Sequence, residues 1–288
     1  MLNLWVEFFE DLQQVRGRSR NTVMAYRRDL DLYEEFKNLN KPIGQIYEFL
    51  NKHKLSARSQ ARVISSIRTY LKFCETLGFG APELRELKPP KVNAALPKAV
   101  DINDFKKLFE ASIVEDPNKT IRNQITLLML FGLGCRVTEM IEINLSDFNE
   151  TDSWICVTGK GGKQRLIPVM DSLIIDLKKY LLEVRPTLVK SKTESILIND
   201  RGNRPSRIDI WRWLDAWSKK AGFTKTISPH KFRHGCATSL LEGGADLRSI
   251  QMLLGHSSIQ TTQIYTNVST RKIQKEIDEH HPLSGLES

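Results

Sequence analysis

The chain has 288 residues, of which 40% are hydrophobic and 27% charged, a balance typical of a folded protein with one large domain or two ordinary ones. No apolar run approaches the roughly 18 residues of a membrane span, the first residues lack a basic signal pattern, and the four scattered cysteines argue against a zinc or disulfide framework and favour a reducing cytosol. Lys and Arg total 43 against 34 Asp and Glu, and this net charge of +9 favours a large polyanion as partner, because neutralised phosphates release counterions.

Residues 1–87 are predicted to form an all-helical domain. The apolar periodicity indicates helices over 3–14, 22–39, 43–53 and 56–77. Asn21 is expected to cap the second of these, because its short side chain can accept a hydrogen bond from the first helical turn. In the fourth, Val63, Ile67 and Tyr70 repeat at helical spacing and predict one buried face.

Arginines gather at two places in this helical domain. Arg20 and Arg27 lie near the second helix, and Arg58 and Arg62 lie four residues apart in the fourth. A single exposed arginine most often only solvates a helix face. Two such clusters in one small domain of a basic protein instead favour contacts with phosphate groups, so these four are candidate DNA-binding residues.

Residues 88–98 contain three prolines, which cannot continue a helix, and predict a linker to a second domain over 99–288. In that domain we expect helices at 101–112, 121–133, 171–184, 207–221, 229–242, 246–254, 258–265 and 269–279, and strands at 154–157 and 165–169. The fold class is therefore mainly α with a small β-sheet. The adjacent His280 and His281 are expected to lie in a solvated tail.

Six residues of the second domain suit the transfer of a phosphodiester without a metal. They are Arg136, Lys160, His230, Arg233, His256 and Tyr265. Planar guanidinium groups pair with phosphate oxygens through two hydrogen bonds. His230 and Arg233, three residues apart on one helix face, could bind one phosphate together.

The remaining members of this set supply proton transfer and a nucleophile. Lys160 lies in a glycine-rich turn and could protonate a leaving 5′-oxygen, because the pKa of an ammonium falls beside other cations. Tyr265 could attack phosphorus, with His230 as a candidate base and His256 as a donor to a phosphate oxygen. Taken singly, such a lysine is usually a surface residue and such a tyrosine a packing residue. The turn lacks the spacing of a nucleotide-binding P-loop.

Together the spacings are specific. Lys160 follows Arg136 by 24 residues, and Tyr265 follows His256 by 9. The pattern resembles the tyrosine recombinases of the phage-integrase superfamily, most closely the bacterial Xer recombinases of the XerC/XerD type. The matching segments are 21–30, 159–161, 251–256 and 263–266, and the likeness extends over nearly the whole chain to 280–282. One departure is Cys135, where family members usually have leucine.

The resemblance implies a role for each candidate. Arg136, His230 and Arg233 would hold the scissile phosphate, Lys160 would be the general acid, His256 would take a position that is tryptophan in some relatives, Tyr265 would become a 3′-phosphotyrosine, and Glu139 would support the site. No metal or other cofactor is implied, because the phosphotyrosine conserves the bond energy. The helical core-DNA-binding domain and the catalytic domain would form a DNA clamp. Each C-terminal helix would dock on a neighbouring protomer.

The resemblance also implies a biological setting. Four protomers, alike or of two kinds, would act on two double-stranded DNA recombination sites through a Holliday junction. The expected role is resolution of chromosome or plasmid dimers by a cytoplasmic, nucleoid-associated enzyme, with a second Xer recombinase and a septal DNA translocase as candidate partners and no membrane. The alternatives are an integrase or transposase-type recombinase of a mobile element, a type IB topoisomerase and an inactive DNA-binding homologue. The target sequence and the choice between one recombinase and a pair stay open.

Overall fold

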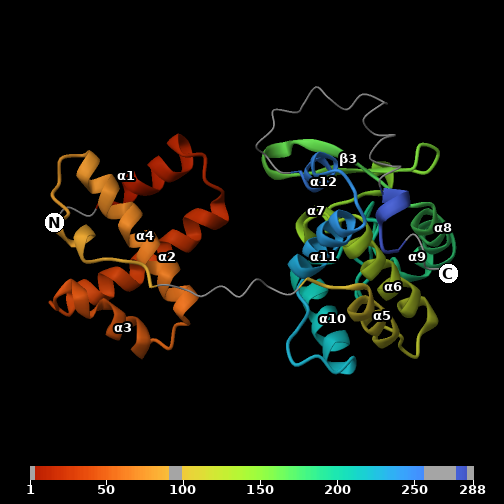
Figure 1. Cartoon of the computed structure of the whole chain (residues 1–288), viewed down its shortest axis with the longest axis horizontal. Helices are drawn as coiled ribbons and strands as arrows, with labels where there is room; N and C mark the ends of the chain where they lie inside the picture. The colour runs from red at the N-terminus through yellow and green to blue at the C-terminus, as the bar shows by residue number, and fades with distance from the viewer. Residues whose placement is uncertain (1–3, 91–98, 256–276, 284–288) are drawn as a thin grey trace. The chain divides into compact units, whose positions relative to one another are not determined.

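The computed structural model describes residues 4–90, 99–255 and 277–283 (Figure 1). The chain divides into two units, Met1–Leu96 and Pro97–Ser288, and each has its own hydrophobic core. Residues 91–98 of the expected linker and the expected helix 258–265 lie outside the described ranges. No helix within those ranges is long and apolar enough to cross a membrane.

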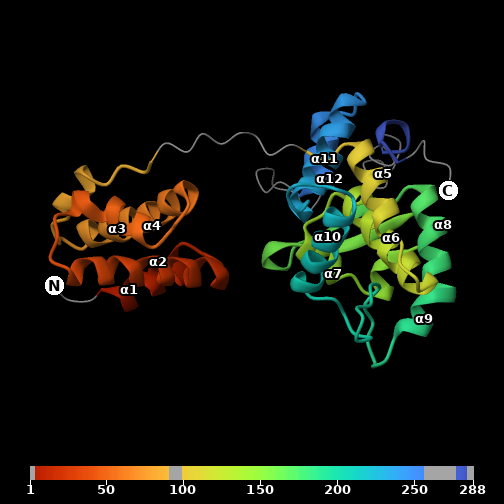
Figure 2. The ribbon, with the colours of Figure 1, turned by 90° about the horizontal axis from the view of Figure 1, so that it is seen from below.

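The N-terminal unit is helical, as the sequence predicts. Its elements are α1 (Trp5–Glu10), the π-helical turn η1 (Asp11–Val15), α2 (Arg20–Asn38), the short 3₁₀ turn η2 (Ile43–Gln45), α3 (Ile46–Lys52), α4 (Ala57–Thr76) and the 3₁₀ turn η3 (Pro82–Arg85). Figure 2 shows α3 and α4 on one side of the unit and α1 and α2 on the other. The expected apolar face of α4 is confirmed, since Val63 and Ile67 are fully buried in the core.

The cap of α2 differs from the prediction. The helix begins at Arg20, and Ser19 is its N-cap, with extended backbone and a hydroxyl that accepts a hydrogen bond from the amide of Thr22. Asn21 therefore lies inside the first turn. Serine and asparagine are both good caps, and the helix begins two residues earlier than the predicted Thr22, with Ser19 in that role.

The second unit is mainly helical around a small sheet. Its elements are α5 (Ile102–Ala111), α6 (Pro117–Gly132), α7 (Val137–Ile141), the 3₁₀ turn η4 (Leu145–Asp147), β1 (Phe148–Asn149), β2 (Trp154–Thr158), the 3₁₀ turn η5 (Lys160–Gly162), β3 (Gln164–Pro168), α8 (Asp171–Lys179), the π-helical η6 (Tyr180–Val184), α9 (Arg185–Leu188), α10 (Arg207–Lys220), α11 (Pro229–Glu242) and α12 (Leu247–Leu254). The short α7 and β1 were not predicted. The sheet is antiparallel in the order β1-β2-β3.

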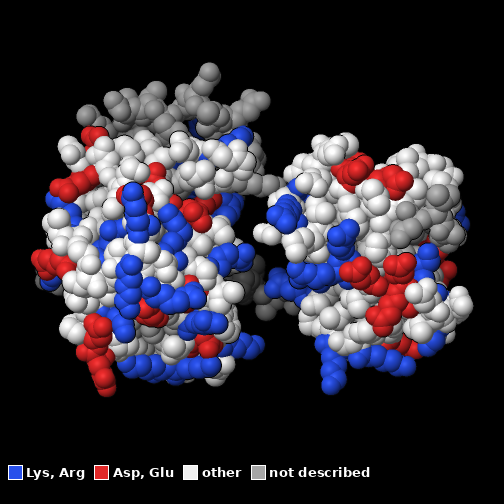
Figure 3. All heavy atoms as spheres, turned by 180° about the vertical axis from the view of Figure 1, so that it is seen from behind, with Lys and Arg blue, Asp and Glu red and all other residues white. Residues whose placement is uncertain are grey.

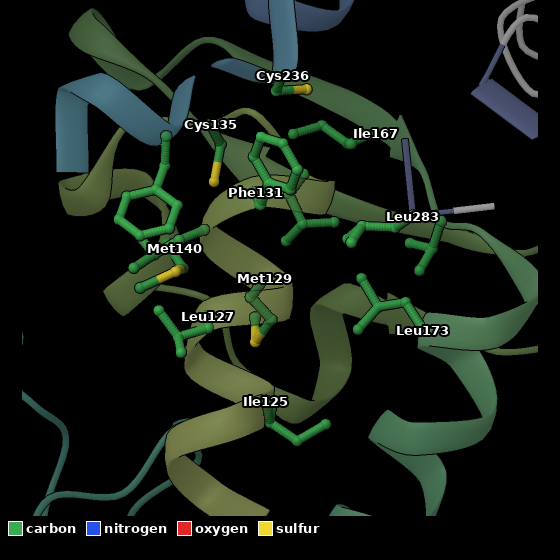
Figure 4. Close-up of a cluster of buried hydrophobic side chains, with 14 of the residues drawn as sticks. Ile125, Leu127, Met129, Phe131, Cys135, Met140, Ile167, Leu173, Cys236 and Leu283 are labelled. Atoms are coloured by element: carbon green, nitrogen blue, oxygen red, sulfur yellow. The ribbon is translucent and has the colours of Figure 1, made fainter. Parts of the chain in front are cut away.

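The core of this unit is built around α6, which packs against α5, α8 and α11. Figure 4 shows apolar side chains gathered along α6 and meeting Ile167 of β3 and Leu173 of α8. The helix starts four residues before the predicted Ile121, because Asp116 accepts hydrogen bonds from two amides of the first turn and Pro117 is already compatible with it. Because α6 is buried, its packing fixes the position of the turn that follows its C-terminal end.

His281 corrects the expectation of a solvated tail. Its side chain is only 2% exposed. The ring stacks edge-on against Phe131 of α6, Nε2 lies 3.4 Å from the Phe131 carbonyl oxygen, and Nδ1 accepts a hydrogen bond from the Leu283 amide. A histidine with both nitrogens in use and an aromatic neighbour is a core residue, so residues 277–283 are fastened to the end of α6.

Candidate active site

Arg136 is presented by a sharp turn at the end of α6. Gly134 has a φ of +55°, and a Cβ there would lie 2.9 Å from the sulfur of Cys236 on α11, so the turn requires glycine. Cys135 follows with its side chain buried, and Arg136 then caps α7 with extended backbone. The Arg136 side chain is 45% exposed, so it emerges at a turn end, as the sequence suggests. Burial raises the pKa of the Cys135 thiol to about 12, which makes it a packing group.

The Glu139 carboxylate holds the Arg136 side chain in place. One carboxylate oxygen accepts a hydrogen bond from Arg136 Nη1 at 2.8 Å, and the other accepts from the Arg136 backbone amide at 2.9 Å. The Glu139 side chain is only 4% exposed. Burial by itself would raise the pKa of this carboxyl, but hydrogen bonds from Arg165 and Arg136 outweigh it and hold the pKa below its usual value. Glu139 is therefore a buried carboxylate that fixes the direction of one guanidinium.

Arg233, on α11, reaches the same turn from the opposite side. Its Nη1 donates to the Gly134 carbonyl at 3.0 Å, and its Nη2 donates to the Leu254 carbonyl at 2.6 Å. Burial, and next the nearby Arg136, lower the pKa of the Arg233 guanidinium. An arginine stays charged in proteins, so the physical meaning is that Arg233 is a partly buried cation with a second cation, Arg136, nearby. A bound anion would relieve the repulsion between the two.

Arg136 and Arg233 are thus brought together by the fold, since both are anchored within two residues of Gly134. Their free guanidinium edges could donate to the non-bridging oxygens of one phosphate. His230 is the second residue of α11 and is exposed, one turn before Arg233 on the same helix. This is the shared helix that the sequence predicts for the two.

Of the other candidates, the structure describes the backbone at Lys160 and the residue that precedes His256. Lys160 begins η5, the turn between β2 and β3, and the turn is closed by a hydrogen bond from the Gly159 amide to the Lys163 carbonyl at 2.7 Å. His256 directly follows Gly255, the αL residue that ends α12. His256 and Tyr265 themselves lie outside the described residues.

Arg165 was missed by the sequence reasoning. It lies on β3 opposite Val157 of β2, and its side chain is only 8% exposed. Nη2 donates to Glu139 at 2.8 Å, and Nε donates to the Leu253 carbonyl of α12 at 3.0 Å. A signal did exist: positions 165 and 167 share a strand face, so a charged residue beside inward Ile167 demands a buried partner.

The arginines proposed for DNA contact in the N-terminal unit differ in how they are engaged. All four, Arg20, Arg27, Arg58 and Arg62, are exposed to some degree. Arg62, however, donates to both oxygens of the buried Asp29, and Arg27 lies over the Phe9 ring at 5.3 Å. Arg62 therefore has a structural task within the unit.

Comparison with known proteins places this fold in one class. Residues 98–272 match the phage integrase family, and residues 6–76 match the N-terminal SAM-like domain of phage integrases. The chain belongs to the phage integrase family, the tyrosine recombinases, and the predicted enzyme class and mainly helical two-part fold are confirmed.

Particular relatives narrow the class to the Xer recombinases. The chain is 38% identical over 288 residues to the tyrosine recombinase XerD of Staphylococcus saprophyticus, covering 96% of this chain and 97% of that one. It is 35% identical over 296 residues to XerD of Listeria monocytogenes, covering 98% and 99%.

Solved structures of the class share the fold. A crystal structure of XerA recombinase is 27% identical with a TM-score of 0.50, covering 95% of this chain and 98% of that one. Lambda integrase bound to DNA is 18% identical with a TM-score of 0.68, covering 98% of each chain, which shows the fold alone.

Proposed function

We propose that this recombinase cuts and rejoins DNA at a specific site, with Tyr265 as nucleophile and the Arg136–Arg233 pair as the phosphate cradle. The observation that carries the proposal is the convergence of these two guanidinium groups on the Gly134 turn, with Glu139 buried beneath them. Two cations held close together by a rigid frame suit an anion that gains charge during reaction. A phosphodiester under attack is such an anion.

The proposed step transfers the phosphoryl group without net hydrolysis. The Tyr265 phenol oxygen, after losing its proton to a base such as His230, bonds to phosphorus while the bond from phosphorus to the 5′-oxygen breaks. Lys160 gives its proton to that oxygen. Arg136, Arg233 and His256 donate to the non-bridging oxygens, and loss of one such donor typically costs about 2.7–4 kcal/mol of barrier. The 3′-phosphotyrosine then accepts a 5′-hydroxyl by the reverse step.

The proposed substrate is double-stranded DNA. The net charge of +9 supports it, and Figure 3 shows a broad field of Lys and Arg side chains on one face of the catalytic unit. Among proteins of this fold, XerH has been solved on a difH substrate after cleavage, and lambda integrase as a tetramer on a Holliday junction. We extend that assembly to this chain: four protomers on two sites.

The proposed cellular role is resolution of chromosome or plasmid dimers in the cytoplasm. The extended similarity to XerD proteins supports it. A second Xer recombinase and a septal DNA translocase are the partners that this role would require. If the protein instead relaxed any supercoiled DNA as a monomer, its activity would be that of a type IB topoisomerase, and the proposed role would be wrong.

A covalent-trapping experiment tests the chemistry. Genomic fragments bound by the protein are recovered, and the shared site is rebuilt as a nicked suicide duplex, from which the cleaved strand cannot religate. We expect a 3′-linked protein–DNA adduct that forms in EDTA and is absent with Tyr265→Phe. An adduct that persists in that variant would overturn the assignment of the nucleophile.

A further inference from the structure

We propose that Arg165 is the positioning residue of this active site: it joins the Arg136 support, the turn that carries Lys160 and the C-terminal end of α12. The inference rests on the proposed function, because it concerns how the same site is held. Arg165 is not a catalytic residue, since its guanidinium is buried beneath the phosphate cradle. Its role is to make three separate chain segments move as one.

The first link runs to Arg136 through Glu139. Arg165 Nη2 donates to the same Glu139 oxygen that accepts the Arg136 backbone amide, while the other oxygen receives Arg136 Nη1. Glu139 alone would neutralise the charge of Arg136. With Arg165 as a second cation on the same carboxylate, the three side chains keep a net charge of +1. Arg136 can therefore direct positive potential toward a phosphate.

The second link runs to α12 and the residue after it. Arg165 Nε donates to the Leu253 carbonyl, in the last turn of α12. Gly255 lies against the same guanidinium: a Cβ there would be 3.0 Å from three of its atoms, and its φ is +67°. The C-terminal end of α12 is thus shaped around the Arg165 side chain.

The third link runs to the turn that carries Lys160. A Cβ on Gly159 would lie 3.8 Å from Arg165 Nη1 and 3.5 Å from a Glu139 oxygen. A side chain at Gly159, immediately before Lys160, would therefore meet the buried ion pair at ordinary van der Waals distance. The same turn joins β2 to β3, on which Arg165 pairs with Val157. The Arg165 guanidinium thus binds the end of α12 and lies beside the turn that carries Lys160.

The fork shape of arginine matters here, because Nε and Nη2 donate in different directions at once. A lysine would keep the charge but could not place donors at Glu139 and at the Leu253 carbonyl with the same geometry. We therefore expect Arg165→Lys to lower the single-turnover cleavage rate on the suicide duplex by roughly 10- to 100-fold, the effect of a small misplacement of reacting groups. DNA affinity should change less than about twofold, because the side chain is buried away from solvent.

The matched control is Arg122→Lys. Arg122 is also buried in the same unit, where it pairs with Asp200 and lies over the Trp213 ring. If Arg165 only stabilised the fold, the two substitutions would lower cleavage alike at equal loss of thermal stability. We expect the cleavage defect with Arg165→Lys and not with Arg122→Lys.

A second pair of variants keeps the proposal testable where Arg165→Lys does not fold. Gly255→Ala forces a methyl group into the guanidinium, while Gly222→Ala imposes similar backbone strain, at a φ of +78°, in open space. We expect slow cleavage with Gly255→Ala only. Where Arg165→Lys does fold, the double variant should cleave no more slowly than the slower single variant, because both changes break one contact.

The outcomes separate this inference from the proposed function. Absence of a Tyr265-dependent adduct with the unaltered protein would reject the function itself. With that adduct present, a folded Arg165→Lys protein that cleaves within twofold of the unaltered protein would overturn the positioning role. Multiplicative defects in the Arg165–Gly255 double variant would likewise overturn it.

Discussion

The buried His281 predicts a loss of stability in mildly acidic solution. The ring is enclosed at the end of α6, and burial lowers its pKa to about 4, against an ordinary value of 6.5. In the unfolded chain the same imidazole takes up a proton as the pH falls below 6.5. The unfolded state therefore binds more protons than the folded state between pH 6.5 and pH 4, and folding is progressively disfavoured across that window.

The magnitude follows from the two pKa values. At pH 7 both states are mostly neutral and the penalty is small. At pH 5 the solution lies about 1.5 pH units below the pKa of the unfolded imidazole, and protonation stabilises the unfolded state by about 1.4 kcal/mol for each of these units. The folded imidazole is still mostly neutral at this pH. We expect His281 to remove about 2 kcal/mol of unfolding free energy between pH 7 and pH 5. Below about pH 4 the penalty stops growing.

The assay is urea unfolding at pH 7, 6 and 5, followed by tryptophan fluorescence. The signal reports mainly the second unit, which holds four of the five tryptophans: Trp154, Trp211, Trp213 and Trp217. The control is His281→Gln, whose amide can still donate to the Phe131 carbonyl but does not titrate. The difference between the two proteins isolates His281 from every other group. Equal dependence on pH in both would refute the reasoning.

Three further predictions concern charged groups. Glu139→Gln should destabilise the second unit by about 3–5 kcal/mol, because it leaves buried Arg165 without its carboxylate; a loss under 1 kcal/mol in urea unfolding would contradict the buried pair. Arg62→Ala should cost the first unit about 1–3 kcal/mol, because the buried Asp29 carboxylate loses its cation and keeps only the hydrogen bond from Ser66. Arg58→Ala should leave hydrogen-exchange protection unchanged and lower the salt dependence of DNA binding by about one counterion; equal effects of the two variants on protection would reject the distinction. Lys160→Ala should slow cleavage of a normal 5′-oxygen leaving group and spare a 5′-sulfur one, which needs no proton; equal slowing would reject its role as general acid.

The long helices could be predicted because their signals are local. The predicted helices 101–112 and 246–254 begin at Asp101 and Asp246, whose side chains each accept a hydrogen bond from an amide of the first turn of α5 and of α12, respectively. By contrast, α7 has five residues and no apolar repeat long enough to detect. It depends on Glu139 accepting the Arg136 amide, and Glu139 in turn is held by Arg165, 26 residues further along the chain.

The residues of the site also differ in whether local sequence signals can indicate them. Residues with reactive side chains can be chosen from sequence, because the chemistry restricts the residue types and the spacing restricts the family. Arg165 and His281 cannot be chosen that way, since neither carries a chemical step. Each satisfies a backbone carbonyl on a helix distant in sequence, Leu253 for one and Phe131 for the other, and that need exists only after packing.

The two cradle arginines are fastened in different ways, and the difference has a consequence for binding. Arg233 is held by two backbone carbonyls, which are neutral, and so keeps its full charge while two of its five N–H donors fix its direction. Arg136 is held by a carboxylate, which would cancel its charge were Arg165 not bound to the same group. Both solutions provide fixed donors without losing positive potential, and donors fixed before the substrate arrives need no reorganisation in the transition state. Removal of the Arg165 side chain should therefore reduce the positive potential that Arg136 directs at a phosphate more than the potential from Arg233.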